Sequence, residues 1–215
     1  MEPSRNLEQL LNGIDKNVVV CAATKYASSE DSLKLLKYGI NNFAENRVDA
    51  FLKKYDDLKD YGITWHFIGH LQSNKAKLIA SKIDYLHSLD SLKLARLLND
   101  SRTTPLNCFV EVSINGEESK DGIKPEDALE FVRNLLQYKN INVVGFMMMS
   151  VKYSDHESLM SQFAKLADLK KSVEKELNID IPYLSMGMSG DYEEAIEAGA
   201  THIRLGRILF DGFEY

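Results

Sequence analysis

The chain of 215 residues has little proline and little cysteine, four and two residues respectively. With 12 glycines and 27% charged residues, its composition is close to that of an ordinary globular protein. Such a composition excludes a collagen-like chain, a disordered chain and a disulfide scaffold. The two cysteines, Cys21 and Cys108, each lie in an apolar run, which is typical of small buried side chains.

A long apolar run and an excess of positive charge are also missing. Nowhere do about 18 apolar residues follow one another, and the first residues, MEPSRNLEQLLNG, lack the apolar core of a signal peptide. The chain has 26 Lys and Arg against 32 Asp and Glu, a net charge of -6, and no basic run. We therefore expect a cytoplasmic protein that binds neither a membrane nor nucleic acid, so that any anionic ligand is held by a local site.

Several familiar motifs do not occur. The sequence has no Gly-rich dinucleotide fingerprint, no Walker loop and no nucleophile-elbow serine. His66 and His70 are four residues apart on an expected strand, which is not the spacing of a helical metal pair. A hydrogen-bonded histidine inside the fold is therefore favoured over a zinc site, and we expect no metal. Met147, Met148 and Met149 are interpreted as core and pocket side chains.

What the sequence does have is a regular alternation of apolar strands and amphipathic helices. The continuous apolar run 18–23 is typical of a strand buried on both faces. A helix should follow it, capped by Ser28 or Ser29 and ended by Gly39. The further strands are expected at 40–44, 65–68, 83–88, 108–114, 143–149, 182–186 and 201–205. The helices between them are expected at 48–58, 73–81, 91–99, from Pro125 onward, at 154–177 and up to Ala198.

This alternation implies parallel strands joined by right-handed crossovers. An open doubly wound sheet and a closed barrel are both compatible with it, but about eight strands at intervals of roughly 20 to 40 residues favour the barrel. We predict an α/β fold, a single (β/α)8 TIM barrel spanning 1–215 as one domain. Reactive residues of such a barrel gather at the carboxyl ends of its strands.

Lys25 directly follows the first apolar run. A lysine sheltered from water at the mouth of a barrel more easily forms the neutral amine, which can attack a carbonyl carbon. An exposed lysine at the end of a strand is the other interpretation, since most lysines are solvated.

The segment SMGMSGDYEEAIEAGA, from Ser185 onward, is a candidate phosphate site. Ser189 can cap a helix there, and Gly187 and Gly190 allow backbone amides to approach a ligand. The loops after the seventh and eighth strands often bind phosphate in such barrels, and Gly206 occupies the second of these places. An ordinary capped helix is the alternative.

Arg204 lies inside the last expected strand. A guanidinium within a barrel is costly unless it is paired, so a carboxylate or a ligand atom should meet it.

The sequence blocks VCAATKYAS, FAENRV, WHFIGHLQSNKAK, GFMMMS and LSMGMSGDYEEAIEAGATHIRLGRILF resemble, in this order, those of the pyridoxal phosphate homeostasis protein family. The resemblance implies a barrel like the N-terminal domain of alanine racemase, with pyridoxal 5′-phosphate held as an aldimine on Lys25. It places the phosphate at Ser189, Gly206 and Arg207, and Arg204 at the pyridine nitrogen. The cofactor-binding residues that it implies are Lys25, Asn46, Met147, Ser185, Ser189, Arg204, Gly206 and Arg207.

The resemblance also bears on activity. An arginine at the ring nitrogen disfavours ring protonation and makes the cofactor a weaker electron sink. The sequence shows no equivalent of the second domain of alanine racemase, whose tyrosine is the opposing acid and base. We therefore expect no catalytic residue, but a monomeric carrier and buffer of pyridoxal 5′-phosphate with apo-enzymes as partners. A racemase or lyase that uses Tyr26 or a second subunit is the alternative, and a cofactor-free aldolase is a third possibility.

Overall fold

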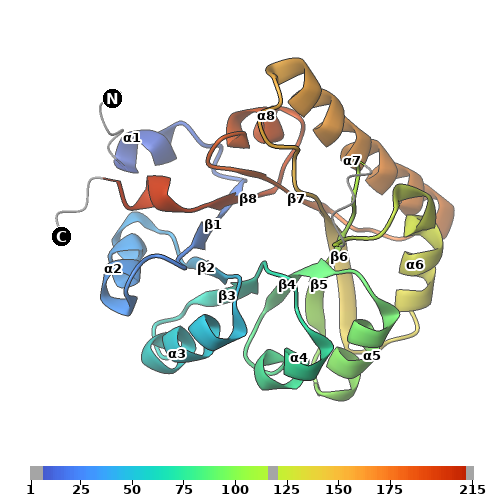
Figure 1. Ribbon diagram of the computed structural model, residues 1–215, viewed down its shortest axis with the longest axis horizontal. Coiled ribbons are helices and arrows are strands. Elements are labelled where there is room, and N and C mark those ends of the chain that lie inside the picture. Colours follow the sequence, from blue (N-terminus) through green and yellow to red (C-terminus); the bar gives the residue numbers. More distant parts are fainter. Residues whose placement is uncertain (1–6, 116–120, 212–215) are drawn as a thin grey trace.

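The structure is a computed structural model, and it describes residues 7–115 and 121–211. Its eight parallel strands close into a barrel in sequence order, and β8 pairs with β1 (Figure 1). The predicted (β/α)8 barrel is thereby confirmed. The strands are β1 Val19–Ala23, β2 Asn42–Glu45, β3 Thr64–Phe67, β4 Tyr85–Leu89, β5 Leu106–Glu111, β6 Ile141–Met147, β7 Tyr183–Met188 and β8 His202–Leu205.

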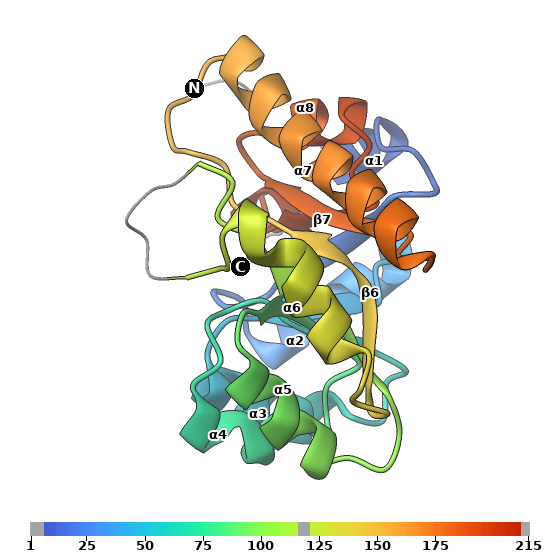
Figure 2. The ribbon, with the colours of Figure 1, turned by 90° about the vertical axis from the view of Figure 1, so that its right-hand side faces the viewer.

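Helices surround the barrel in Figure 1, and Figure 2 shows α6 and α7 side by side on its outer face. None of the described helices is long and apolar enough to cross a membrane. The helices are α1 Leu7–Asn12, α2 Ser29–Lys34, η1 Leu35–Tyr38, α3 Val48–Leu58, α4 Ser73–Ile79, α5 Leu92–Asp100, η2 Pro125–Asp127, α6 Ala128–Leu135, α7 His156–Leu177, α8 Tyr192–Glu197 and η3 Arg207–Leu209.

Local capping explains where several helices begin and end. Ser28 caps α2 by accepting a hydrogen bond from the amide of Asp31, and Ser91 caps α5 in the same way. Gly39 ends η1 at φ 77°, a left-handed conformation that glycine adopts without strain. The helix limits predicted from capping residues are therefore close to those of the structure.

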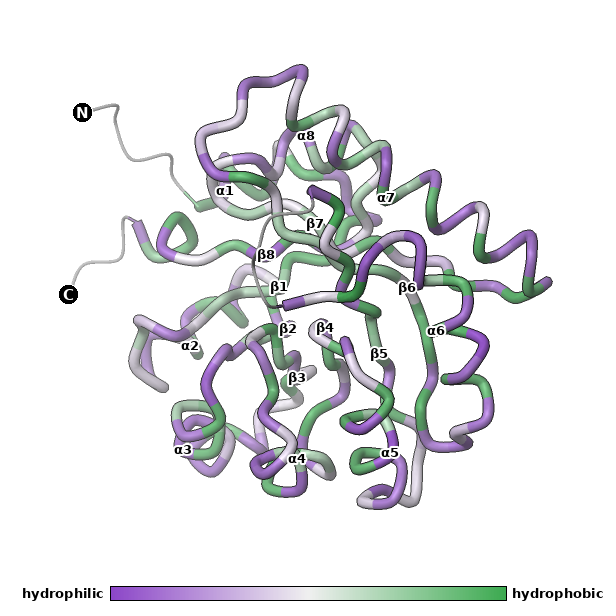
Figure 3. Tube along the Cα trace, turned by 45° about the vertical axis from the view of Figure 1, so that its right-hand side comes forward, coloured by the Kyte–Doolittle hydropathy of each residue, from purple (hydrophilic) through white to green (hydrophobic). Residues whose placement is uncertain are grey.

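The core has two layers. Large apolar side chains such as Leu35, Phe51 and Phe163 are fully buried. In Figure 3 the strands β5 and β6 are mainly hydrophobic, whereas α6 and α7 alternate between hydrophobic and hydrophilic residues, as amphipathic helices do. The barrel interior is filled by a group of rings that contact one another, namely His66, Tyr85, His87, Phe109, Tyr183 and His202.

The predicted limits of three elements were wrong in a way that affects the site. Strands β5 and β6 both begin and end earlier than expected. Strand β5 ends at Glu111 instead of 114, and β6 ends at Met147 instead of 149. Helix α8 begins at Tyr192 with Asp191 as its N-cap, not at Ser189. The cause of the error at α8 is the tight turn after β7, in which the amide of Met188 donates to Asp191 Oδ1 at 2.6 Å.

Candidate functional site

A cavity of about 460 Å³ opens at the carboxyl ends of the strands. This is the end at which barrels of this kind place their reactive groups. The structure brings six of the eight predicted site residues together in its wall: Lys25, Asn46, Ser189, Arg204, Gly206 and Arg207.

Lys25 reaches this cavity from the loop after β1. Thr24 is fully buried, but the Lys25 side chain is exposed, and its Nζ lies 5.0 Å from the centre of the Tyr26 ring. The expectation of an amine sheltered from water was wrong, because β1 ends at Ala23 and the chain leaves the barrel two residues later. Lys25 is thus an exposed lysine at a strand end that also lines the cavity.

A buried ion pair fixes the backbone on both sides of Lys25. Lys54 Nζ donates hydrogen bonds to the carbonyl oxygens of Thr24 and Ala27, at 2.5 and 3.1 Å, and lies 2.8 Å from Glu45 Oε1. The Thr24 hydroxyl donates to the same oxygen at 2.6 Å. Both Lys54 and Glu45 are buried, at 7% and 0% exposed. The loop that carries Lys25 is therefore held from beneath by two side chains.

Arg204 enters the cavity from β8 and is 6% exposed. Its Nη1 donates to the carbonyl oxygen and the hydroxyl oxygen of Ser185, at 2.9 and 2.7 Å, and its Nη2 donates to the carbonyl oxygen of Met148 at 2.9 Å. Burial lowers the pKa of Arg204, while the more distant carboxylates of Glu111 and Asp191 raise it. Arg204 makes no ion pair with a carboxylate of the described chain, so neutral oxygens satisfy a buried cation.

The Ser185 hydroxyl continues this contact into the barrel. His87 Nδ1 lies 2.8 Å from Ser185 Oγ, His87 Nε2 lies 2.9 Å from His66 Nδ1, and His66 Nε2 lies 3.0 Å from Asn42 Oδ1. Because Arg204 donates to Ser185 Oγ, the hydroxyl hydrogen is available to His87 Nδ1. Each histidine then donates from Nε2, and a single direction of donation runs from Arg204 to Asn42.

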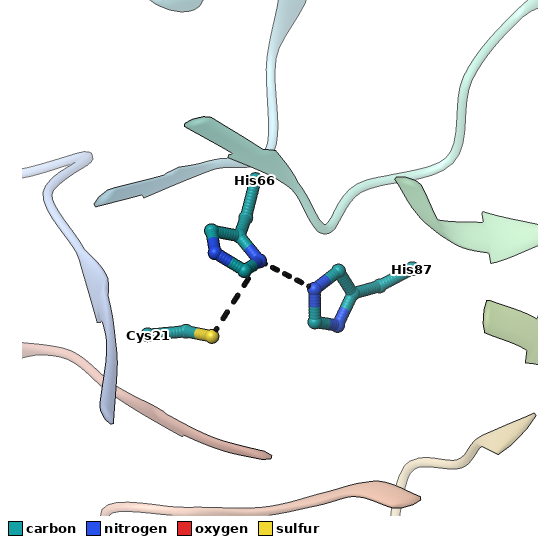
Figure 4. Close-up of side chains that lie close together, drawn as sticks. All are labelled: Cys21, His66 and His87. Atoms are coloured by element: carbon teal, nitrogen blue, oxygen red, sulfur yellow. Dashed lines mark hydrogen bonds between the residues drawn. The ribbon is translucent and has the colours of Figure 1, made fainter. Parts of the chain in front are cut away.

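Figure 4 shows the centre of this series of hydrogen bonds, where Cys21 from β1 meets the two histidines from β3 and β4. Burial lowers the pKa of His66 to about 3 and that of His87 well below its usual value. Burial also raises the pKa of Cys21 to about 12, so its thiol, 3.7 Å from His66 Nδ1, keeps its proton. All three side chains are uncharged near neutral pH.

Two predicted site residues lie beneath the cavity and not in its wall. Ser185 is fully buried under Arg204, and Met147 is 1% exposed and packs against Phe109 and Val144. Since β6 ends at Met147, the loop residue Met149 lines the cavity instead.

The loops after β7 and β8 meet beside Lys25. The amide of Gly206 donates to Ser189 Oγ at 3.3 Å, and the Arg207 guanidinium lies 5.9 Å from the centre of the Tyr26 ring. Because α8 starts later than expected, Ser189 does not cap it. A hydroxyl, a cation and loop backbone converge here, and they are groups suited to an anion.

Gly187 has a different role from the one predicted. Its φ is 91°, and a Cβ at this position would lie 2.6 Å from the Cβ of Ala195. It lets β7 and α8 pack closely and is absent from the cavity wall. At Gly190, by contrast, a Cβ would meet no atom within 4 Å, so this glycine has open space beside the cavity.

Glu111, which sequence reasoning missed, also lines the cavity. It is the last residue of β5 and is 9% exposed, and its carboxyl group makes no hydrogen bond or ion pair with the described residues. Burial, and then the charges of Asp90 and Asp121, raise its pKa to about 7, while Arg204 acts in the opposite direction. The available signal was an acidic residue closing the apolar strand CFVE.

His66 and His70 lie in different surroundings. His66 is inside the barrel, whereas the His70 side chain is 50% exposed, with its Nδ1 3.2 Å from Asp121 Oδ1 and 3.8 Å from Asp90 Oδ2. The two histidines do not converge on one point.

Residues 4–212 match the family model described as alanine racemase, N-terminal domain. An alanine racemase of Clostridium difficile 630 has the same fold, with a TM-score of 0.77 at 17% identity, over 98% of this chain and 57% of that one. The fold and the site define a barrel of the alanine racemase N-terminal class.

Several curated relatives share more of the sequence. A pyridoxal phosphate homeostasis protein of Aquifex aeolicus is 38% identical over 196 residues, which is 90% of this chain and 86% of that protein. One of Vibrio alginolyticus is 36% identical over 97% of this chain and 92% of its own length. PipY of Synechococcus elongatus, solved with PLP bound, has a TM-score of 0.87 at 26% identity, over 95% of this chain and all of that one. The chain belongs to the pyridoxal phosphate homeostasis protein family.

Proposed function

We propose that this chain binds pyridoxal 5′-phosphate at the barrel mouth and acts in pyridoxal phosphate homeostasis as a carrier and buffer. One observation carries the proposal: a single cavity contains the amine of Lys25, the buried guanidinium of Arg204, and the Ser189 and Gly206 loops. The names of the relatives and the PLP bound to PipY support the same ligand.

The groups of the cavity fit the parts of the cofactor. When bound, pyridoxal 5′-phosphate supplies an aldehyde that condenses reversibly with a primary amine, with loss of water. Lys25 Nζ is the amine of the cavity wall that would bond to the aldehyde carbon. The Ser189 hydroxyl, the backbone of the Gly206 loop and the Arg207 guanidinium would hold the phosphate.

Other residues orient or enclose the ring. Arg204 would face the pyridine nitrogen, Asn46 contributes to the wall, and Ser185 fixes Arg204 from beneath. Met147 packs under the floor. Arg204 stays charged and offers no proton acceptor, so it disfavours protonation of the ring nitrogen and makes carbanion chemistry unfavourable. A protein that stores the cofactor without turning it over fits this arrangement.

The first experiment locates the covalent link. We expect the purified protein, loaded with pyridoxal 5′-phosphate, to absorb in the visible range and, after borohydride reduction, to carry the added mass on the peptide that contains Lys25. Lys25→Ala should abolish the adduct, whereas Lys53→Ala, an exposed lysine of α3, should not. An adduct of unchanged yield in Lys25→Ala would exclude Lys25 from this role.

The second experiment tests transfer and turnover. Loaded protein should restore the activity of an apo-enzyme that uses pyridoxal 5′-phosphate, and light scattering should give the mass of one chain. A racemase or lyase would exchange the α-hydrogen of an added amino acid with solvent deuterium. Tyr26, its candidate second base, is 72% exposed and adjacent to Lys25. We expect exchange no faster than with the free cofactor.

The location in the cytoplasm belongs to the same proposal. Cys21 and Cys108 are both free and buried thiols, as a reducing compartment allows.

A further inference from the structure

Cys21, His66 and His87 form a cluster of metal-ligating side chains inside the barrel (Figure 4). They belong to β1, β3 and β4, and all three are fully buried. His66 Nδ1 lies 3.7 Å from Cys21 Sγ and 2.9 Å from His87 Nε2, and the three atoms lie within 4.8 Å of one another. The histidine that His66 meets is therefore His87, and not His70.

The hydrogens of this cluster outnumber the lone pairs that can accept them. His66 donates from Nε2 to Asn42, so its Nδ1 has one lone pair, and His87 donates from Nε2 to that lone pair. The Cys21 thiol has the same nitrogen as its single hydrogen-bond partner among the described residues. Two hydrogens thus compete for one acceptor, at a point around which three atoms could each offer an electron pair to a metal.

The separations in the cluster suit one bound ion. A d10 metal ion lies about 2.0–2.3 Å from imidazole and thiolate ligands, so two donors that share the ion are roughly 3.3–3.8 Å apart. The contact between Cys21 and His66 already has this length at 3.7 Å. The contact of 2.9 Å between His66 and His87 has to open by roughly half an ångström.

The two rings are held in place by their other contacts. The His66 ring stacks on Tyr85 with centroids 4.6 Å apart and an interplanar angle of 5°, and the His87 ring packs on Phe109 with centroids 4.4 Å apart. The ring nitrogens that face away from the cluster contact side-chain oxygens of β2 and β7, at 3.0 and 2.8 Å. Outer contacts of this kind orient the histidines of metal sites.

The charge near the cluster decides which metal fits. Arg204 is a buried cation whose charge, besides the larger effect of burial, acts on the pKa of Cys21 and of His87. Zinc with one thiolate would add a net positive charge beside this guanidinium, which is costly in the barrel interior. Copper(I) with one thiolate is neutral. Thiolate is also a soft ligand that favours copper(I), and imidazole binds copper as well.

We propose that Cys21, His66 and His87 bind one copper(I) ion as a trigonal site inside the barrel. The ion replaces the thiol hydrogen, which leaves as a proton to solvent, so a copper–sulfur bond forms and no electron is transferred. The His87 proton moves from Nε2 to Nδ1 and is donated to Ser185 Oγ, which then accepts from both His87 and Arg204. This site does not depend on pyridoxal 5′-phosphate.

The first experiment measures copper(I) binding without oxygen and with ascorbate as the reductant. The whole chain is refolded from urea with copper(I), because the three side chains are fully buried in the folded protein, and the coloured chelator bicinchoninate then competes for the ion. We expect the wild-type protein to retain one copper per chain. Cys21→Ala should weaken binding more than about a hundredfold, since even an outer contact of a metal site is worth about 10- to 100-fold.

Cys108→Ala is the matched control. Cys108 is also fully buried, but its Sγ contacts the carbonyl oxygen of Leu106 at 3.5 Å and belongs to no such cluster of the described residues. This variant should bind copper(I) as the wild-type protein does, and circular dichroism shows whether both variants fold. An equal loss of affinity in the two variants, or none in Cys21→Ala, would overturn the site.

A second measurement identifies the ligands in the unaltered protein. X-ray absorption at the copper edge should show one sulfur and two nitrogen atoms around the metal. A spectrum without sulfur, or zinc retained in preference to copper(I), would contradict the proposal. So would a wild-type chain that refolds and retains no copper against the chelator.

Discussion

Arg204 Nη1 donates one hydrogen bond to the carbonyl oxygen of Ser185 and another to its hydroxyl oxygen, at 2.9 and 2.7 Å. The two residues lie on neighbouring strands, β7 and β8. A buried cation is thus oriented without an anion beside it, and its charge remains available to a ligand in the cavity. The same hydroxyl contacts His87 at 2.8 Å, so Ser185 joins the cavity to the polar interior of the barrel.

Ser185→Ala should therefore weaken both folding and binding. The substitution leaves one donor of Arg204 and Nδ1 of His87 without a partner, which should lower the free energy of unfolding by about 1–3 kcal/mol. Urea unfolding and titration with pyridoxal 5′-phosphate measure the two effects. Ser161→Ala, on the exposed face of α7, is the control. Stability within about 0.5 kcal/mol of the wild-type value would contradict the assigned network.

The buried histidines predict a loss of stability in mild acid. Burial lowers the pKa of His66 to about 3, that of His202 to about 4, and that of His87 well below 6.5. The unfolded chain binds these protons as the pH falls below about 6.5, while the folded chain does not, so acid favours unfolding. Each histidine contributes about 1.4 kcal/mol per pH unit in this window.

Glu111 opposes this trend. Its folded pKa is about 7, above its unfolded value, so between about pH 7 and 4.5 the folded state binds the proton first. The three histidines lower the free energy of unfolding as the pH falls, and the one carboxyl group raises it. The net result should be a fall of roughly 3 kcal/mol per pH unit from about pH 6 to pH 5. Glu111→Gln should steepen this slope, and His202→Asn should reduce it. Stability that is constant over this interval would refute the neutral histidines.

The Lys54–Glu45 pair gives a third prediction. Lys54→Met leaves the fully buried Glu45 carboxylate without its cation, and the free energy of unfolding should fall by about 3–5 kcal/mol. The double variant Glu45→Gln/Lys54→Met removes both charges and should recover part of the loss. In the double variant Lys54 no longer holds Thr24 and Ala27, so borohydride trapping at Lys25 should remain slower than in the wild-type protein. If trapping at Lys25 in the double variant were as fast as in the wild-type protein, Lys54 would not position the loop.

Much of the barrel could be predicted because its strands and helices alternate in a pattern visible in the sequence. The apolar run before Lys25 and the capping residue Ser28 gave the limits of β1 and α2 to within a residue or two. The limits of β5 and β6 were displaced because apolar residues continue past the last paired residues, through Val112 and Met148. Where a strand leaves the barrel depends on its pairing register with the neighbouring strands. The composition of a single strand does not reveal that register.

The site was predictable only as far as each residue could be judged alone. Arg204 and the Gly206 loop are recognisable from residue type and position, and the structure places both in the cavity wall. The exposure of Lys25 and the isolation of Glu111 depend on what the other strands bring near them. Both are properties of the closed barrel.

Gly69 gives the last prediction, because it holds the loops after β2 and β3 in close contact. A Cβ at position 69 would lie 2.1 Å from the carbonyl oxygen and 2.8 Å from the Cα of Asn46, and the Gly69 carbonyl accepts a hydrogen bond from Ser88 at 2.6 Å. Gly69→Ala must therefore displace the backbone of Asn46, a residue of the cavity wall. We expect a loss of about 1–3 kcal/mol in the free energy of unfolding, together with weaker binding of pyridoxal 5′-phosphate.

Gly13→Ala is the matched control for Gly69→Ala. A Cβ at position 13 meets its nearest atom, the carbonyl oxygen of Leu10, at 3.4 Å, which is an ordinary contact, and Gly13 is not part of the cavity wall. This variant should keep wild-type affinity and change stability by less than about 1 kcal/mol, since alanine restricts the unfolded chain more than glycine does. If Gly69→Ala behaved like Gly13→Ala in both measurements, the contact between Gly69 and Asn46 would not shape the cavity, and Asn46 would have to be held by other means.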